Sequence, residues 1–213
     1  MTKGRQPVHP KKIGFDFDGV IADIGEAFIR LACEEYNHCG ISMDQITQFD
    51  VERCLNMPPE IVETIFLQIL RDSVGTGLMP MPGAVPILEE MSCQAPVTIV
   101  TARPMGDPVR AWLRYHCSGR VHRQVRLVAM GDHDDKVRHI KNLGLTCFID
   151  DRVETCMMLT EAGITSYLFA QPWNQSCTAL PRVESWADIR RLYAKKESEA
   201  VCVSDSPGTK TNS

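Results

Sequence analysis

Two aspartates near the start of the chain, Asp16 and Asp18, carry the most chemical information. They follow the apolar segment 13–17 and precede Gly19, so we expect them where a strand ends and the chain turns. Residues i and i+2 of an extended strand point to the same face, so both carboxylates should project together. Two such charges repel each other unless a cation lies between them. The pair therefore indicates a hard divalent cation with oxygen ligands, Mg²⁺ above all.

The same two side chains could also perform a reaction. One carboxylate can attack as a nucleophile while the other transfers a proton. The alternative is a surface loop with two solvated acids, and the apolar neighbours Ile13, Phe15 and Phe17 argue against it. We therefore interpret this segment as a candidate reaction centre.

The composition is that of an ordinary globular protein. The chain has 213 residues, 44% of them hydrophobic and 23% charged, enough for one domain or for a core with a small insert. A formal net charge of −4 argues against binding to polymeric nucleic acid or to anionic membranes. No apolar run approaches the ~20 residues that cross a bilayer, and the polar N-terminus has no signal-peptide core. We expect a cytoplasmic protein.

The nine cysteines show no metal-binding or redox spacing. None forms a C-x-x-C pair, their number is odd, and several lie in apolar runs, as Cys147 does. We expect buried or incidental thiols in a reducing compartment, with no disulfide framework.

The segment that follows the first strand is predicted to be mostly helical. Apolar residues at helical spacing predict a helix over 25–39, which a glycine can end. A second helix is expected over 61–71, behind two prolines that a first helical turn tolerates. Residues 24–81 would then form a small helical cap inserted after the first strand, which we call the helical insert.

From residue 83 onward, predicted helices and strands alternate. The strands are short, apolar and not alternating, which is typical of a parallel sheet covered on both faces. Repeated units of this kind predict a doubly wound, Rossmann-like α/β core. The predicted strands are 97–100, 125–130, 146–149 and 165–169, and the predicted helices are 84–92, 108–116, 135–143, 153–162 and 186–194.

These elements predict a division of the chain into a core and an insert. The core comprises 12–23 and 82–196, and the helical insert lies between the two parts. Residues 1–11 are expected to be a flexible N-terminus, and 197–213, rich in Ser, Thr, Gly and Lys, a disordered tail.

Polar residues follow two further predicted strands. Thr101, Ala102 and Arg103 come directly after 97–100, and Asp150 and Asp151 come directly after 146–149. In doubly wound sheets, ligands bind outside the carboxyl ends of the strands. Thr101 could instead cap a turn, and the two aspartates could cap the next helix. Their shared position after apolar strands favours one common site.

A lysine could balance the negative charge of that site. Lys136 lies at the start of a predicted helix between the second and the last of these strand ends. A solvated surface lysine is the alternative. Lys141 is a weaker candidate for the same role.

These motifs together resemble the haloacid dehalogenase (HAD) superfamily of phosphotransferases. The segment Asp16-Phe17-Asp18-Gly19-Val20 matches the first motif of that superfamily, Thr101 the second, Lys136 the third, and Asp150-Asp151 the fourth. The match covers about residues 12–170. The resemblance implies a Mg²⁺-dependent phosphatase.

The resemblance also implies a role for each motif residue. Asp16 would be the nucleophile that forms an aspartyl-phosphate, and Asp18 the general acid and base. Mg²⁺ would be held by Asp16, by the backbone carbonyl of Asp18 and by Asp151, with Asp150 as a supporting partner behind them.

The two remaining motif residues would act on the phosphoryl group itself. Thr101 would donate its hydroxyl proton to a phosphoryl oxygen, and Lys136 would supply positive charge.

A closer resemblance is to the type C 5'-nucleotidase branch of this superfamily. It rests on residues 16–23, the helical insert directly after them, 168–174 and 182–186. It implies a nucleoside monophosphate as substrate. The alternatives are a phosphatase or phosphomutase for another small phosphometabolite, or a noncatalytic binding protein that kept the fold.

The helical insert is predicted to act as a lid that excludes water and contacts the leaving group. Candidate substrate contacts are Asp23, Phe28, Ala102 and Arg103. Trp173 could stack on a substrate base or simply pack.

Overall fold

The computed structural model describes residues 6–131 and 136–194. The predicted tail, 197–213, and the first part of the predicted flexible N-terminus, 1–5, lie outside the described residues, as does Asp135 of the predicted helix 135–143.

The centre of the fold is a parallel sheet in which six strands are described, in the order β3-β2-β1-β4-β5-β6. This confirms the predicted doubly wound α/β fold. The strand β1 lies between β2 and β4, so the chain leaves it in one direction and later returns to its other side. The strands are β1 (Ile13–Phe15), β2 (Thr98–Thr101), β3 (Arg126–Ala129), β4 (Cys147–Asp150), β5 (Thr165–Phe169) and β6 (Arg182–Val183).

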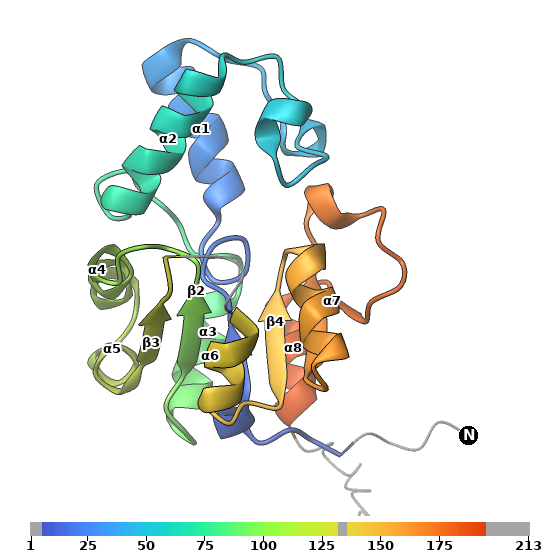
Figure 1. The fold of residues 1–213 in the computed structure, drawn as a ribbon. Coiled ribbons are helices and arrows are strands. Elements are labelled where there is room, and N and C mark those ends of the chain that lie inside the picture. Colours follow the sequence, from blue (N-terminus) through green and yellow to red (C-terminus); the bar gives the residue numbers. More distant parts are fainter. Residues whose placement is uncertain (1–5, 132–135, 195–213) are drawn as a thin grey trace, which may run out of the picture.

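Helices cover both faces of this sheet (Figure 1). On one face α6 packs against α7, and on the other α3 packs against α8 and α5. Their bounds agree with the sequence prediction to within one or two residues, except that α5 was not predicted. These helices are α3 (Ala84–Ser92), α4 (Asp107–His116), α5 (Gly119–Gln124), α6 (Lys136–Asn142), α7 (Val153–Glu161) and α8 (Trp186–Tyr193).

The helical insert lies beyond the carboxyl ends of the strands (Figure 1). Its two long helices, α1 (Ile24–Tyr36) and α2 (Pro59–Arg71), pack against each other. The segment between them contains two short 3₁₀ turns, Met43–Gln45 and Val51–Arg53.

The two chain segments that join the insert to the core run side by side. Ala22 and Pro80 form an antiparallel bridge. The amide of Asp23 donates to the Met79 carbonyl at 2.8 Å, and the amide of Met81 donates to the Ile21 carbonyl at 2.8 Å. This pairing fixes both crossing segments next to the loop that follows β1.

The hydrophobic core extends from the sheet into the insert. One large cluster contains Phe15 on β1, Trp112 on α4 and Phe28 on α1, and all three are fully buried. A smaller cluster joins residues of α6 and α7 to the sheet and includes Ile140 and Phe148, both fully buried. Because the large cluster is shared, the insert and the sheet bury apolar surface together.

The prediction that no cysteine forms a disulfide is wrong for Cys33 and Cys39, which are joined. The helix α1 ends at Tyr36, and Asn37 adopts a left-handed conformation with φ 58°. The chain therefore turns back, and the two Cα atoms lie 4.2 Å apart. Cys147 and Cys156 are buried, as expected, whereas Cys93 is exposed.

Among the described residues, none of the helices combines the length and the apolar character that crossing a membrane would require.

The indole of Trp186 on α8 links the fold to the loop after β1. Trp186 is fully buried, its ring centroid lies 5.1 Å from that of Phe15, and its Nε1 donates to the Val20 carbonyl at 2.9 Å. We expect Trp186→Phe to keep most of the apolar contact but to lose this hydrogen bond. The free energy of unfolding should fall by about 1–3 kcal/mol, because a buried carbonyl loses its donor. Urea unfolding would measure this change, and an unchanged midpoint would contradict it.

Candidate active site

Three adjacent strand ends bring the predicted motif residues together. Asp16 and Asp18 follow β1, Thr101 ends β2, and Asp150 ends β4 with Asp151 directly after it. Because β1 pairs with both β2 and β4, these ends are neighbours at the carboxyl edge of the sheet. The amide of Asp16 donates to the Ile149 carbonyl at 2.9 Å, which continues the pairing past the end of β1.

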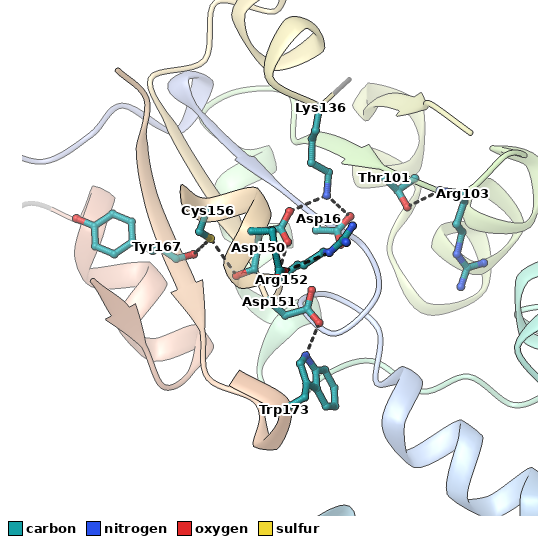
Figure 2. Close-up of polar contacts among 11 residues, drawn as sticks. Asp16, Thr101, Arg103, Lys136, Asp150, Asp151, Arg152, Cys156, Tyr167 and Trp173 are labelled. Atoms are coloured by element: carbon teal, nitrogen blue, oxygen red, sulfur yellow. Dashed lines mark hydrogen bonds and ion pairs between the residues drawn. The ribbon is translucent and has the colours of Figure 1, made fainter. Parts of the chain in front are cut away.

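Lys136 lies between two of these carboxylates (Figure 2). Its Nζ is 3.0 Å from Asp16 Oδ1 and 2.6 Å from Asp150 Oδ2. Lys136 is buried at the start of α6, whereas Lys141 is exposed near the end of that helix. The other carboxylate oxygen of Asp150, Oδ1, accepts from the amide of Arg152 at 2.9 Å. Both oxygens of Asp150 are therefore already engaged.

The carboxylates of Asp16, Asp150 and Asp151 form a cluster that fits a divalent cation. Each offers one oxygen, and these oxygens lie within 4.8 Å of one another. Within the described residues, buried Asp16 Oδ1 has an ion-pair contact with Lys136 but no hydrogen bond of good geometry. An all-oxygen, partly unsatisfied acidic cluster suits a hard cation such as Mg²⁺.

Burial and mutual repulsion change how these groups titrate. Burial raises the pKa of Asp16 to about 7, and the charges of Asp150 and Asp18 add to this, while Lys136 opposes it. Burial also raises the pKa of Asp151 well above its ordinary value, with Asp150 and Asp16 contributing. Although burial alone would lower the pKa of Lys136, the adjacent Asp150 and Asp16 hold it above its ordinary value. One lysine does not neutralise this cluster, so additional positive charge would be favourable.

Trp173 and Asn174, in the loop that follows β5, hold Asp151 in place. Trp173 Nε1 donates to Asp151 Oδ2 at 2.9 Å (Figure 2), and Asn174 Nδ2 donates to the Asp151 carbonyl at 2.8 Å. Sequence reasoning gave Trp173 only stacking or packing roles and missed Asn174. The signal was available, because both residues follow a predicted apolar strand, as the other motif residues do.

Gly19 allows the loop after β1 to approach Asp151. Its φ is +72°, and a Cβ at this position would lie 2.4 Å from Asp151 Oδ2. Any side chain here would displace the carboxylate from its position beside Asp16.

Asp18 has a different partner from Asp16. Arg103 Nε donates to Asp18 Oδ2 and Arg103 Nη2 to Asp18 Oδ1, both at 2.7 Å. The Arg103 side chain is 2% exposed, and its backbone amide donates to Thr101 Oγ1 at 3.3 Å (Figure 2). Arg103, predicted as a substrate contact, therefore forms a bidentate ion pair with Asp18, the second carboxylate of the first motif.

A cavity of about 330 Å³ opens next to these groups. Asp16, Asp18, Thr101 and Asp151 line it on the side of the sheet. Three of the four predicted substrate contacts, Phe28, Ala102 and Arg103, also line it. Its apolar wall comes mainly from the insert and consists of Ile24, Phe28, Ile46, Phe49, Val51, Phe66, Leu70 and, from the core, Trp173.

The fourth predicted contact, Asp23, does not line this cavity. Its Oδ1 accepts from the amide of Glu26 at 3.1 Å, so its carboxylate caps the N-terminus of α1. This is a frequent use of aspartate.

The contact between Gly19 and Asp151 can be tested by substitution. Gly19→Ala should lower the free energy of unfolding more than Gly163→Ala does. Both glycines have positive φ, +72° and +81°, so both substitutions carry about 1–2 kcal/mol of backbone strain. Only Gly19 has a neighbour at its Cβ position, since nothing lies within 4 Å of that of Gly163. Chemical unfolding of both variants would measure the difference. Equal losses of unfolding free energy would contradict the prediction, because they would show that the Asp151 side chain moves aside without cost.

The raised pKa of Asp16 predicts a pH-dependent stability in EDTA. Between 3.8, the ordinary value, and about 7, the folded state retains a proton that the unfolded state has lost. Stability contributed by Asp16 therefore falls as the pH rises through this window. The free energy of unfolding of Asp16→Asn minus that of the unsubstituted protein should therefore increase by about 1 kcal/mol or more from pH 4 to pH 8. Unfolding curves at several pH values would measure this, and parallel stability profiles of the two proteins would contradict it.

The comparisons with solved structures find the same fold in HAD-superfamily proteins. A HAD-superfamily hydrolase from Ehrlichia chaffeensis has a TM-score of 0.50 at 13% identity, covering 88% of this chain and 98% of its own. The HAD-like family protein SP0104 from Streptococcus pneumoniae has a TM-score of 0.55 at 14% identity, covering 85% and 97%. A predicted phosphoglycolate phosphatase from Haemophilus somnus 129PT has a TM-score of 0.54 at 17% identity, covering 87% and 98%.

The sequence itself matches a family model over residues 10–197. That family is described as 5' nucleotidase, deoxy (pyrimidine), cytosolic type C protein. No curated protein matches the chain. The family match confirms both the HAD resemblance and the expectation of a phosphatase. Because the match covers most of the chain, and the strand ends carry the motif residues, this chain belongs to the cytosolic type C 5'-nucleotidase family of HAD hydrolases.

Proposed function

We propose that this phosphatase is Mg²⁺-dependent, that it acts through a phosphorylated Asp16, and that its substrate is a nucleoside monophosphate. The observation that carries the proposal is the division of the first motif between two environments. Asp16 faces the acidic cluster and Lys136, whereas Asp18 is held by Arg103, so two neighbouring carboxylates are available for two different tasks.

In the first step, an Asp16 carboxylate oxygen forms a bond to phosphorus while the bond between phosphorus and the ester oxygen breaks. Asp18 enters this step protonated and gives its proton to the departing oxygen, so an alcohol leaves rather than an alkoxide. The Asp18 carboxylate that remains is the form that pairs with Arg103. Lys136 keeps the Asp16 carboxylate in place through its 3.0 Å contact. The hydroxyl of Thr101 is buried at the same edge and can donate to a phosphoryl oxygen.

In the second step, Asp18 takes a proton from a water molecule as that water attacks phosphorus. The bond between phosphorus and Asp16 breaks, inorganic phosphate leaves, and both carboxyl groups return to their starting states. Asp18 can act in both steps because it lies two residues from Asp16 on the same loop and lines the same cavity.

Asp16, Asp151 and the backbone carbonyl of Asp18 would hold Mg²⁺. Asp150 would support them from behind, because both of its carboxylate oxygens already have partners. When bound, Mg²⁺ supplies positive charge that offsets the repulsion between an anionic phosphate and these carboxylates.

We infer that residues 24–81 act as a cap over this chemistry, on a core formed by 12–23 and 82–196. Two features support this division. The connecting segments meet at the Ala22–Pro80 bridge, and the insert supplies most of the apolar wall of the cavity. An apolar cover would exclude water until the leaving group has departed.

The lining of the cavity supports an uncharged organic group on the substrate. Arg103 is the basic side chain of this lining, among the described residues, and it is already paired with Asp18. The insert adds Asp50 and Glu52, both exposed, which would repel a second anionic group. The aromatic rings of Phe49 and Trp173, which are at least partly exposed, offer flat apolar surface of the kind that a nucleobase contacts. A phosphomutase would need a place for a second phosphate, which this lining disfavours.

Activity with p-nitrophenyl phosphate tests the chemistry. We expect turnover with MgCl₂, a loss of about 100-fold or more in EDTA, and recovery when Mg²⁺ is restored in excess. Asp16→Asn should lose at least about 1,000-fold while staying folded, because the amide is a poor nucleophile. Asp107→Asn, at an exposed aspartate that starts α4, is the matched control and should keep its activity. Retained turnover in Asp16→Asn would move the nucleophile elsewhere.

A substrate panel tests the leaving group. Nucleoside monophosphates and deoxynucleoside monophosphates should exceed nucleoside diphosphates and 2-phosphoglycolate in kcat/KM by about 100-fold. The physical reason is the unpaired second anion that the latter would place beside Asp50 and Glu52. Equal or faster turnover of 2-phosphoglycolate would overturn the nucleotide proposal and leave the phosphatase chemistry intact.

A further inference from the structure

A single buried arginine connects the proposed acid to the root of the helical insert. Arg103 uses Nε and Nη2 to hold both oxygens of Asp18, and its Nη1 donates to Ser73 Oγ at 2.6 Å. Ser73 lies just after α2, in the segment that returns from the insert to the core, and is 1% exposed. The guanidinium therefore touches the reaction centre and the insert at the same time.

Ser73 extends this contact into α2 itself. Its Oγ accepts from Arg103 and donates to the Ile69 carbonyl in the last turn of α2, at 3.0 Å. A continuous path of hydrogen bonds thus runs from α2 through Ser73 and Arg103 to Asp18. The position of α2 and the orientation of the Asp18 carboxylate are consequently linked.

The burial of Arg103 makes this geometry demanding. Its guanidinium carbon lies 4.9 Å from the centroid of the Phe17 ring, and the side chain is 2% exposed. A buried guanidinium is costly unless its donors are satisfied, and a bidentate pair fixes the plane of the carboxylate as well as its distance. Lysine cannot reproduce this planar fork.

We propose that Arg103 is a positioning residue that aligns Asp18 for proton donation and is itself held in place by Ser73 at the end of α2. The proposal rests on the proposed function, because it concerns the step in which the Asp18 proton passes to the ester oxygen as the bond between phosphorus and that oxygen breaks. The helical insert would then fix the orientation of the acid through Ser73 and Arg103.

A comparison of two substrates with different leaving groups distinguishes this positioning role from simple binding of the phosphate by Arg103. A p-nitrophenolate departs without help from an acid, whereas a nucleoside alkoxide needs a proton. The ratio kcat/KM reports the steps up to departure of the leaving group, so the experiment compares this quantity for p-nitrophenyl phosphate and for the best nucleoside monophosphate.

Arg103→Lys is expected to lower kcat/KM for the nucleotide about 10-fold more than for p-nitrophenyl phosphate, and Ser73→Ala about 3-fold more. Ser73→Ala is the milder variant, because it removes one hydroxyl and leaves Arg103 paired with Asp18. It therefore tests the proposal even if Arg103→Lys does not fold. Ser92→Ala is its matched control. Ser92 is also buried near a helix end, where its Oγ donates to the Glu89 carbonyl at 2.7 Å, and this substitution should leave the ratio between the two substrates unchanged.

A double-substitution cycle supplies the second readout. In an Asp18→Asn background, Ser73→Ala should cause no further selective loss on the nucleotide, because the acid that it positions is already gone. Additive losses would overturn the inference. Equal losses on both substrates in Arg103→Lys and Ser73→Ala would also overturn it, in favour of a structural or phosphate-binding role. If the unsubstituted protein hydrolyses neither ester, the proposed function fails as well, so the two failures are distinguishable.

Discussion

The balance of buried charge at the carboxyl edge of the sheet is the constraint on which the rest of the structure depends. Asp16, Asp150 and Asp151 converge there, and among the described residues Lys136 is the cation that pairs with Asp16 and Asp150, while burial raises the pKa of Asp16 and of Asp151. Ionised carboxylates are costly in such surroundings unless cations or hydrogen bonds compensate them. The cluster is thus destabilising by itself, and a bound divalent cation would offset that cost, as expected of a site kept for function.

The fold brings these charged groups together because the strands that carry them are neighbours in the sheet. The strand β1 lies between β2 and β4, so three strand ends deliver their side chains to one place without long loops. The residues around the cluster then fix each group separately, as Trp173 and Asn174 do for Asp151 and as Arg103 does for Asp18. The insert places an apolar wall opposite this charged edge. A phosphate would meet the polar side of the cavity and its organic group the apolar side.

Much of this architecture could be predicted, because its signals are local. Short apolar strands followed by polar residues are visible in the sequence, and they located the parallel sheet and the polar strand ends. The helix α5 and the two-residue strand β6 were missed, since such short elements leave no periodic pattern. The disulfide between Cys33 and Cys39 was also missed, because it depends on the left-handed turn at Asn37 after α1.

The sequence alone determined the fold class, which carboxylates and hydroxyl lie at strand ends, and which lysine begins the helix between them, because backbone pattern and position next to an element are properties of neighbouring residues. Only the tertiary structure decided how these side chains pair. It joined Asp18 to Arg103, 85 positions away, and Arg103 to Ser73 in the insert. It also gave the carboxylate of Asp23 to a helix cap. Such pairings depend on distances set by the packing of separate elements, and those distances leave no trace in the spacing of residues along the chain.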